Sequence, residues 1–279
     1  MREKTRDLKK LAGLAREVRK NVLKMTSAAS SGHPGGSLSA TDILVALYFS
    51  KMRVDSKNPC LEKRDRLVLS KGHGAPALYA TLAEAGFFPK EELSTLRRMH
   101  SRLQGHPERC TPGIDVATGS LGQGLSVANG IAMALRLDNS ESRVYAILGD
   151  GECDEGQVWE AASTAAHFKV DNVCAIVDAN KLQLDGRTDD VKHKRSLAQK
   201  FESFGWHVVR IDGHDFAQIL AALDSAEKIK GKPTAIIADT VKGKGVSFME
   251  NVVGYHGKPL SPEELQKALA ELDANAEVD

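Results

Sequence analysis

The segment 143–186 constrains the fold more than any other part of the chain. It contains two short apolar runs with a stretch of good helix formers between them. Apolar runs of this length predict buried parallel strands, and the stretch between them predicts the crossover helix. The first run ends in Gly149-Asp150-Gly151 and the second run is closed by Asn180. Because parallel crossover units bind ligands beyond the carboxyl ends of their strands, we expect Asp150 and Asn180 to face one crevice.

The same alternation of strand and helix patterns extends over most of the chain. It predicts five parallel strands, at 66–70, 144–149, 172–178, 206–211 and 234–240. This pattern is typical of an α/β fold with a doubly wound, mostly parallel sheet and helices on both faces. We expect residues 1–279 to form a single domain with its core at about 10–258, followed by a C-terminal helix and an acidic tail over 261–279.

Helices are expected between and around these strands. Apolar residues recur at helical spacing over 4–28, which predicts an amphipathic helix. The stretch 30–37 is rich in turn residues and predicts a break, after which Ser39 or Thr41 caps a helix over 42–49. Further helices are predicted at 75–85, 90–99, 125–137, 155–168, 196–204 and 216–226, with the last one beginning at Ser261.

The residue types around Asp150 point to a divalent cation. Glycines on both sides let the backbone approach a ligand, and the helix that follows favours a phosphate at its N-terminus. Glu152, Asp154 and Glu155 follow closely, and their negative charges would repel a bare phosphate. A cation between the carboxylate and the phosphate resolves this conflict.

Mg²⁺ is the cation that best suits such a site, because it prefers six oxygen ligands and commonly joins a carboxylate to substrate phosphates. The Asp150 carboxylate, the Asn180 amide oxygen and the backbone carbonyl of Leu182 would supply three ligands. Two diphosphate oxygens and a water would complete the octahedron.

Composition and charge exclude several other classes of function. The net charge is +1, with 42% hydrophobic and 27% charged residues, so neither nucleic acid nor an anionic membrane is expected as a partner. The four cysteines form no C-x-x-C pair, and no apolar run approaches the length of a membrane span. We therefore expect a cytoplasmic protein. A nucleotide-binding P-loop is excluded, since G-x-x-x-x-G-K-[ST] does not occur.

Several motifs, taken together, resemble one enzyme family. A GDG followed after 28 intervening residues by Asn180 is similar to the fingerprint of thiamine diphosphate enzymes. GDG alone is common, but six motifs in family order resemble the N-terminal, diphosphate-binding half of transketolase. They are SGHPGG (31–36), SKGHG (70–74), GHPE (105–108), TGSLGQGLSVANGIAMA (118–134), GDGECDEGQVWEA (149–161) and YHG (255–257).

The resemblance implies thiamine diphosphate as cofactor, held with Mg²⁺ or another divalent cation such as Ca²⁺ or Mn²⁺. It implies that the metal is bound by Asp150, Asn180 and Leu182. The cofactor-binding residues implied are Gly119, Ser120, Leu121, Gly149, Asp150, Gly151, Glu152, Asn180, His73 and His256. The small residues of the predicted helix 125–137 would let its backbone approach the cofactor and a partner subunit closely. Close packing in a core is the alternative explanation.

Four histidines lie beside glycine in predicted loops at the ligand edge of the sheet. The resemblance places His33 and His256 at the C3 side of a ketose donor, His106 at its C1 hydroxyl, and His73 near the diphosphate and the reactive carbon. Imidazole suits proton transfer near neutral pH. Any single one of them could instead be a structural loop residue. Glu155 stands where transketolases carry an interface glutamate, and a solvated acid at a helix N-terminus is the competing interpretation.

The activity implied is transfer of a two-carbon ketol unit from a ketose phosphate to an aldose phosphate. In the family, a second domain binds the aminopyrimidine ring and supplies the activating glutamate, and this chain ends where that domain would begin. We therefore expect the N-terminal subunit of a split transketolase, active only with a C-terminal partner in a dimer of heterodimers. Ordinary pentose phosphates are the default substrates, and a specialised sugar pathway remains open.

Two alternatives to transketolase remain at this stage. One is a subunit of another thiamine enzyme, such as a deoxyxylulose phosphate synthase or a 2-oxoacid dehydrogenase α chain. The other is a catalytically inert scaffold that binds the cofactor. The GHPGG, GHPE and LGQG motifs argue against the first. The intact Asp150, Asn180 and four histidines argue against the second.

Overall fold

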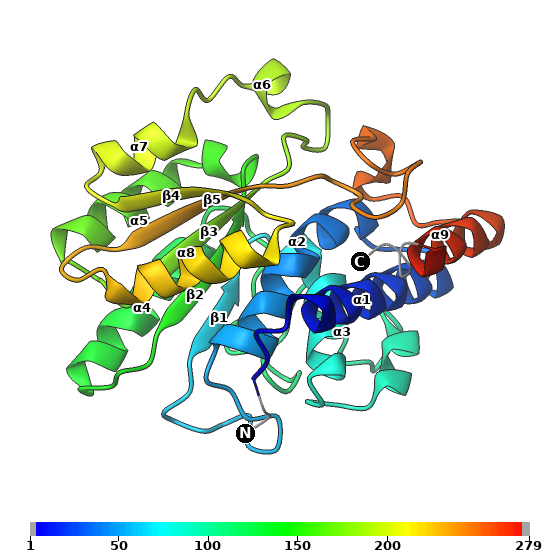
Figure 1. The fold of residues 1–279 in the computed structure, drawn as a ribbon, viewed down its shortest axis with the longest axis horizontal. Helices are drawn as coiled ribbons and strands as arrows, with labels where there is room; N and C mark the ends of the chain where they lie inside the picture. The colour runs from blue at the N-terminus through cyan, green and yellow to red at the C-terminus, as the bar shows by residue number, and fades with distance from the viewer. Residues whose placement is uncertain (1–3, 275–279) are drawn as a thin grey trace.

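A single parallel sheet organises the computed structural model, which describes residues 4–274. The strand order is β1-β2-β3-β5-β4, and every neighbouring pair is parallel, as Figure 1 shows. The five strands are β1 (Arg66–Leu69), β2 (Val144–Gly149), β3 (Val173–Ala179), β4 (His207–Asp212) and β5 (Thr234–Asp239). The predicted α/β architecture is confirmed, and each predicted strand lies within one residue of its observed position.

The helices lie on both faces of this sheet and beside the β1 edge. In chain order they are α1 (Leu8–Ala28), α2 (Pro34–Ala46), α3 (Ala75–Glu84), α4 (Gly124–Leu137), α5 (Gly156–His167), α6 (Thr188–Val191), α7 (Leu197–Ser203), α8 (Phe216–Lys228) and α9 (Pro262–Ala274). Short 3-10 turns occur at Gly72–Gly74, Lys90–Thr95, Glu152–Asp154 and Val253–His256, and a π-turn at Leu47–Lys51. Helix α9 packs along α1 at the side of the molecule (Figure 1).

Alternate side chains of the strands feed two separate apolar layers. On one face, Leu69, Ile147 and Ile176 pack with side chains of α1, α2, α3 and α8. On the other face, Val68 and Ala146 pack with α4, α5 and α7. Because both faces are covered, the strands read as continuous apolar runs, which is why the sequence revealed them so clearly.

The chain is non-helical from Ala29 to His33, but the predicted break at 30–37 extends too far, because α2 already begins at Pro34. The predicted caps Ser39 and Thr41 therefore lie inside α2, whose N-cap is His33. Proline is favourable at the first helical position, and Gly35 and Gly36 follow it within the first turn. A side chain at Gly35 would place its Cβ 2.7 Å from the carbonyl oxygen of Tyr255, so close packing requires a glycine here. Helix α2 is buried along its whole length, and this burial overrides the weak helix propensity of its first residues.

The helix predicted over 90–99 is also shorter than expected. Only a 3-10 segment, Lys90–Thr95, forms there. Arg97 and His100 then adopt positive φ angles of 59° and 65°, which no helix accommodates. The last predicted element is confirmed as α9, whereas residues 275–279 of the predicted acidic tail lie outside the described residues.

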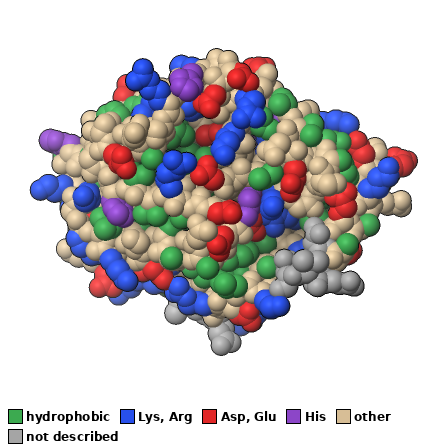
Figure 2. Space-filling view, turned by 45° about the horizontal axis from the view of Figure 1, so that its top comes forward, with side chains coloured by type: hydrophobic (Ala, Val, Ile, Leu, Met, Phe, Trp, Pro, Cys, Tyr) green, Lys and Arg blue, Asp and Glu red, His purple; other side chains and the backbone are tan. Residues whose placement is uncertain are grey.

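The surface carries charges of both signs in close mixture. Figure 2 shows Lys and Arg interspersed with Asp and Glu across one face, in keeping with the net charge of +1. Within residues 4–274, no helix combines the length and the apolar character that crossing a membrane requires.

Two glycines of α4 give a matched test of the packing. A Cβ at Gly124 would lie 2.3 Å from Ser70 Oγ and 2.7 Å from Ser70 Cα, whereas a Cβ at Gly130 meets nothing within 4 Å. We expect Gly124→Ala to lower the free energy of unfolding by about 1–3 kcal/mol through overpacking. Gly130→Ala should raise it by about 0.5–1 kcal/mol through helix propensity. Urea unfolding of both variants measures this, and equal effects would contradict the packing.

Candidate active site

Asp150 lies at the carboxyl end of β2 with its side chain almost fully buried. Its carboxylate accepts hydrogen bonds from the amides of Gly151, at 2.9 Å, and Lys181, at 2.8 Å. Burial and the neighbouring Asp178 carboxylate raise the pKa of Asp150 to about 6. The charge of Lys194 offsets this rise only in part, and a cation beside the carboxylate would stabilise its ionised form further.

Asn180 follows β3, the strand beside β2, and Asp150 follows β2. Gly149 and Asp178 are register partners, so the residues after them extend side by side beyond the sheet. The Asn180 amide nitrogen donates to Asp178 Oδ2 and to Ser39 Oγ, both at 3.3 Å. These bonds fix which way the amide faces, so that its oxygen points away from Asp178.

The predicted metal ligands fit a divalent cation by their chemistry. One buried carboxylate, one oriented amide oxygen and the carbonyl of Leu182 are hard oxygen donors, and Mg²⁺ in proteins prefers such donors. Leu182 O accepts a hydrogen bond from Lys242 Nζ at 3.0 Å, so a positive group already approaches it. The described residues contain no cluster of three His, Cys, Asp or Glu suited to a metal, and the predicted site has only one such residue.

Asp178 joins four elements at the ligand edge, and the sequence analysis did not single it out. It is fully buried, forms an ion pair with Lys71, and accepts hydrogen bonds from Ser39 Oγ at 2.6 Å and from Thr240 Oγ1. Burial alone would raise its pKa, but the Lys71 ammonium holds the pKa of Asp178 below its usual range. Its position two residues before Asn180 was the only available signal.

Lys242 is a second residue that the sequence reasoning missed. It follows β5 and is buried, although the sequence around it, Lys242-Gly243-Lys244-Gly245, matches no P-loop motif. Its ammonium reaches Leu182 O and lies 2.7 Å from His256 Nδ1. Burial and the nearby Lys71 lower the pKa of Lys242 to about 8. The result is a positive group between the predicted metal ligands and the histidines.

Three of the four predicted histidines form a compact triangle. The ring centroids of His33 and His73 are 5.4 Å apart, those of His33 and His256 are 5.5 Å apart, and those of His73 and His256 are 5.4 Å apart. They come from the N-cap of α2, the turn after β1 and the segment before α9. The clustering confirms that these loops meet at the ligand edge.

The triangle is held in the neutral state. Burial, followed by the positive charge of Arg97, lowers the pKa of His33 to about 4. Burial and Lys242 lower the pKa of His256 to about 4, and burial and Lys71 lower that of His73 well below its usual range. The buried Nδ1 atom of His33 has no hydrogen-bond partner among residues 4–274. Neutral imidazoles with free nitrogen atoms can accept or donate a proton at neutral pH.

His106 lies at the exposed rim of this cluster. A Cβ at Gly119 would sit 3.1 Å from the His106 ring, so the predicted cofactor loop packs against it. Arg97 donates to Ser31 Oγ at 2.8 Å, and burial together with the Arg97 charge lowers the pKa of His106. Arg97 was not predicted as a site residue. It adds a guanidinium group to the neighbourhood of His33 and His106.

Comparisons with known proteins agree with this geometry. Residues 12–278 match the family described as "Transketolase, thiamine diphosphate binding domain". The chain belongs to the transketolase family.

Two curated relatives illustrate the match. The chain is 47% identical to the 6-deoxy-6-sulfo-D-fructose transketolase subunit SqwG of Clostridium sp. (strain MSTE9), over 93% of this chain and 94% of that protein. It is 41% identical to an apulose-4-phosphate transketolase subunit of Phocaeicola vulgatus, over 93% of this chain and 92% of that protein.

A solved structure shows the same fold. The transketolase from Campylobacter jejuni aligns with a TM-score of 0.87 and 36% identity, over 95% of this chain. This chain spans 42% of the length of that transketolase. The match therefore covers the diphosphate-binding part of a full-length transketolase.

Glu152, a predicted cofactor residue, has an internal role in this transketolase domain. Its buried carboxylate accepts hydrogen bonds from Ser70 Oγ and from the amides of Gly122 and Gly149, the latter two at 2.9 Å. It thereby joins the loop after β1, the loop before α4 and the end of β2. The predicted repulsion of phosphate by this residue is offset, because three donors face its charge.

The remaining predicted residues lie on the outside of the transketolase domain. Ser120 and Leu121 are exposed in the loop before α4, and Glu155 is the exposed N-cap of α5. Glu155 packs closely on Gly122 of that loop, where a Cβ would lie 2.6 Å away. Their predicted contacts with a cofactor and a partner chain stay predictions.

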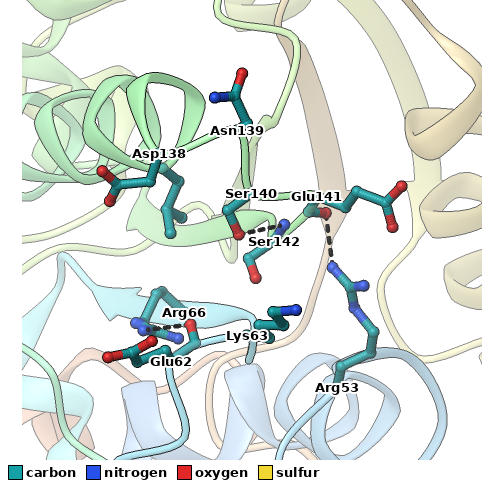
Figure 3. Close-up of a pocket in the computed structure, with 10 residues that line it drawn as sticks. Arg53, Glu62, Lys63, Arg66, Asp138, Asn139, Ser140, Glu141 and Ser142 are labelled. Atoms are coloured by element: carbon teal, nitrogen blue, oxygen red, sulfur yellow. Dashed lines mark hydrogen bonds between the residues drawn. The ribbon is translucent and has the colours of Figure 1, made fainter.

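A separate cavity of about 800 Å³ lies at the opposite edge of the sheet, near the start of β1 and β2. Figure 3 shows that acidic and basic side chains both line it, and that Arg53 donates to the Glu141 carbonyl. Arg66 donates to the backbone of Glu62. The cavity contains none of the predicted site residues, so we assign it no part in the transketolase site.

The raised pKa of Asp150 predicts that the free energy of unfolding of the metal-free protein falls as pH rises. The folded group has a pKa of about 6 against an ordinary value of 3.8. Between these values the folded state keeps a proton that the unfolded state releases, so unfolding becomes easier as pH rises towards 6 and stays so above it. Asp150→Asn does not titrate. Its unfolding free energy relative to wild type should therefore increase by about 2 kcal/mol from pH 4 to pH 8.

Denaturant unfolding without divalent cations, at several pH values, measures this difference. Asp189→Asn is a control for the chemical change itself, since the Asp189 side chain is 62% exposed. A difference for Asp150→Asn that is constant with pH would contradict the assigned environment.

Proposed function

We propose that this chain is the cofactor-binding N-terminal subunit of a two-subunit transketolase. It would act with thiamine diphosphate and Mg²⁺, and with a C-terminal subunit that carries the pyrimidine-binding domain. The observation that carries the proposal is the meeting of two groups at one sheet edge. These are the oxygen donors of Asp150, Asn180 and Leu182, and the neutral triangle of His33, His73 and His256.

The subunit role is supported by two relatives of similar length. Both are named as transketolase subunits, and this chain covers more than nine tenths of each. We infer that residues 1–279 act as one cofactor-binding domain, and that two copies of it join two partner subunits in a heterotetramer.

The chain's own residues would hold the diphosphate end of the cofactor. Asp150, the Asn180 amide oxygen and the Leu182 carbonyl would bind the metal, and the metal would join them to the diphosphate. The Lys242 ammonium lies beside Leu182 O and would contact a diphosphate oxygen, with which it forms a charge-assisted hydrogen bond. Asp178 would keep the Asn180 amide oxygen facing the metal.

When bound, thiamine diphosphate would supply a nucleophilic carbon for reaction with a ketose carbonyl. The neutral His33 and His256 would accept the proton of the donor's C3 hydroxyl as the C2–C3 bond breaks, and return it to the acceptor. His106 at the rim would hold the C1 hydroxyl. His73, in the turn after β1, would donate a hydrogen bond to the oxygen on which negative charge develops.

The substrate class follows from the charge at the rim. The Arg97 guanidinium lies close enough to His33 and His106 to depress both pKa values, and it would attract an anionic sugar. The sugars named for the two relatives are a sulfo sugar and a sugar phosphate. We therefore propose a ketose and an aldose that carry a phosphate or sulfonate group. Pentose phosphates and a specialised sugar pathway both fall within this class.

Cofactor binding is tested by calorimetry with thiamine diphosphate and Mg²⁺. Asp150→Ala and Asn180→Leu should each weaken binding at least about a hundredfold, since each leaves the metal with one ligand fewer and an unfilled position. Asp189→Ala, on the exposed surface, should bind as wild type does. An unaltered affinity in Asp150→Ala would refute the proposed metal site.

Ketol transfer is tested by purifying the chain alone and with a candidate C-terminal subunit. We expect turnover only in the mixture, together with a mass by light scattering that corresponds to two copies of each. His33→Gln in the mixture should lower kcat by about 10²–10⁴ and leave cofactor affinity nearly unchanged, because the change removes a proton acceptor. Turnover by the lone chain would overturn the subunit proposal.

A further inference from the structure

His214 lies in the turn between β4 and α8. Its side chain is only 12% exposed. Nδ1 lies 2.6 Å from Asp42 Oδ2, and Nε2 accepts a hydrogen bond of 2.8 Å from the backbone amide of Val241. His214 therefore connects α2, which begins next to His33, with the residue immediately before Lys242.

The turn is built to bring this imidazole to Val241. A Cβ at Gly213 would lie 2.4 Å from Thr240 Cγ2, so only glycine lets the turn approach the end of β5 this closely. Asp212 accepts a hydrogen bond from the His214 amide at 2.8 Å, and Asp215 caps α8 by accepting from Ala217 and Gln218. In this turn, Asp212 and Asp215 fix the backbone, Gly213 allows the close approach to β5, and His214 accepts the Val241 hydrogen bond.

The hydrogen-bond pattern assigns the tautomer of His214. The Val241 amide can only donate, so Nε2 must be unprotonated and the proton lies on Nδ1, which donates to Asp42. Asp42 is buried and receives both terminal nitrogens of Arg19, one at 3.0 Å. The Arg19 charge holds the pKa of Asp42 below its usual range although burial alone would raise it. The carboxylate is therefore a permanent acceptor for His214.

The consequence is a fixed backbone at the base of Lys242. Thr240 is held by Asp178, and Val241 is held by His214, while the Lys242 ammonium projects to Leu182 O and His256. Loss of the Val241 bond would leave a partly buried amide without a partner and free the segment that directs Lys242.

We propose that His214 is a positioning residue of the cofactor site, which acts through the Val241 amide to place Lys242. Arg19 and Asp42 fix the orientation and tautomer of the imidazole, as carboxylates do for metal-bound histidines. This inference rests on the proposed function, because the task of Lys242 is to contact the cofactor's diphosphate.

Two variants separate the contacts of His214. Asparagine places an amide nitrogen near Nδ1 and keeps the bond to Asp42, but leaves the Val241 amide without an acceptor. Glutamine places its oxygen near Nε2 and keeps that acceptor. We expect His214→Asn to speed hydrogen exchange of the Val241 amide at least about tenfold, and His214→Gln to keep it near the wild-type rate. Equal exchange rates in both variants would overturn the proposal without reference to any cofactor.

The second measurement is the affinity of the full chain for thiamine diphosphate with Mg²⁺. His214→Asn should weaken binding about tenfold, and His214→Gln should restore most of it. In a Lys242→Met background, His214→Asn should have no further effect, because the group that it positions is gone. Effects that multiply instead would show that His214 acts only on general stability, and would overturn the positioning role.

The two proposals fail in different ways. A wild-type chain that binds no thiamine diphosphate with Mg²⁺ overturns the proposed function, and the positioning role falls with it. A wild-type chain that binds the cofactor, with His214→Asn binding equally well, overturns the positioning role alone.

Discussion

The buried carboxylate of Asp178 is the interaction on which the candidate site depends. It lies at the end of the central strand β3 and contacts Lys71 from the β1 loop, Ser39 from α2 and Thr240 from the end of β5. An isolated charge in this position would be prohibitively unfavourable, so the ion pair and the hydrogen bonds form together or not at all. Four segments are thereby fixed around one point, and Asn180 receives its orientation from the same oxygen.

Two kinds of titratable group lie on different sides of Asp178: the carboxyl group of Asp150 and the neutral imidazoles of the histidine triangle. The side towards Asp150 holds a carboxylate whose pKa is raised, which suits a metal that compensates the charge. The side towards His33 holds imidazoles whose pKa values are lowered by burial and by nearby positive groups. Lys242 lies between the two sides and touches both. One buried ammonium group thus links the segment after β3 to the histidine triangle.

Much of this arrangement could be predicted from the sequence. The predictions that were wrong and the residues that were missed share one cause, which is burial by distant parts of the chain. The strands, the pairing of Asp150 with Asn180 and the meeting of the histidine loops follow from local patterns and from the rule that parallel strands present their carboxyl ends together. The early start of α2 was missed because Gly35 and Gly36 are poor helix formers, and burial of the whole helix, including the close approach of Gly35 to Tyr255, makes a helix there favourable. Lys71, Asp178 and Lys242 were missed because single charged residues beside strands look like solvated ones in a sequence.

The sequence by itself determined the parallel α/β fold and the transketolase family, because periodicity and motif spacing are local properties of a chain. The tertiary structure alone decided which charges are buried, which histidines are neutral and which way the Asn180 amide faces. Burial and the charges of distant residues set each of these properties. Residues as far apart in the chain as Asp42, His214 and Lys242 become one network only when the strands bring their loops to the same edge.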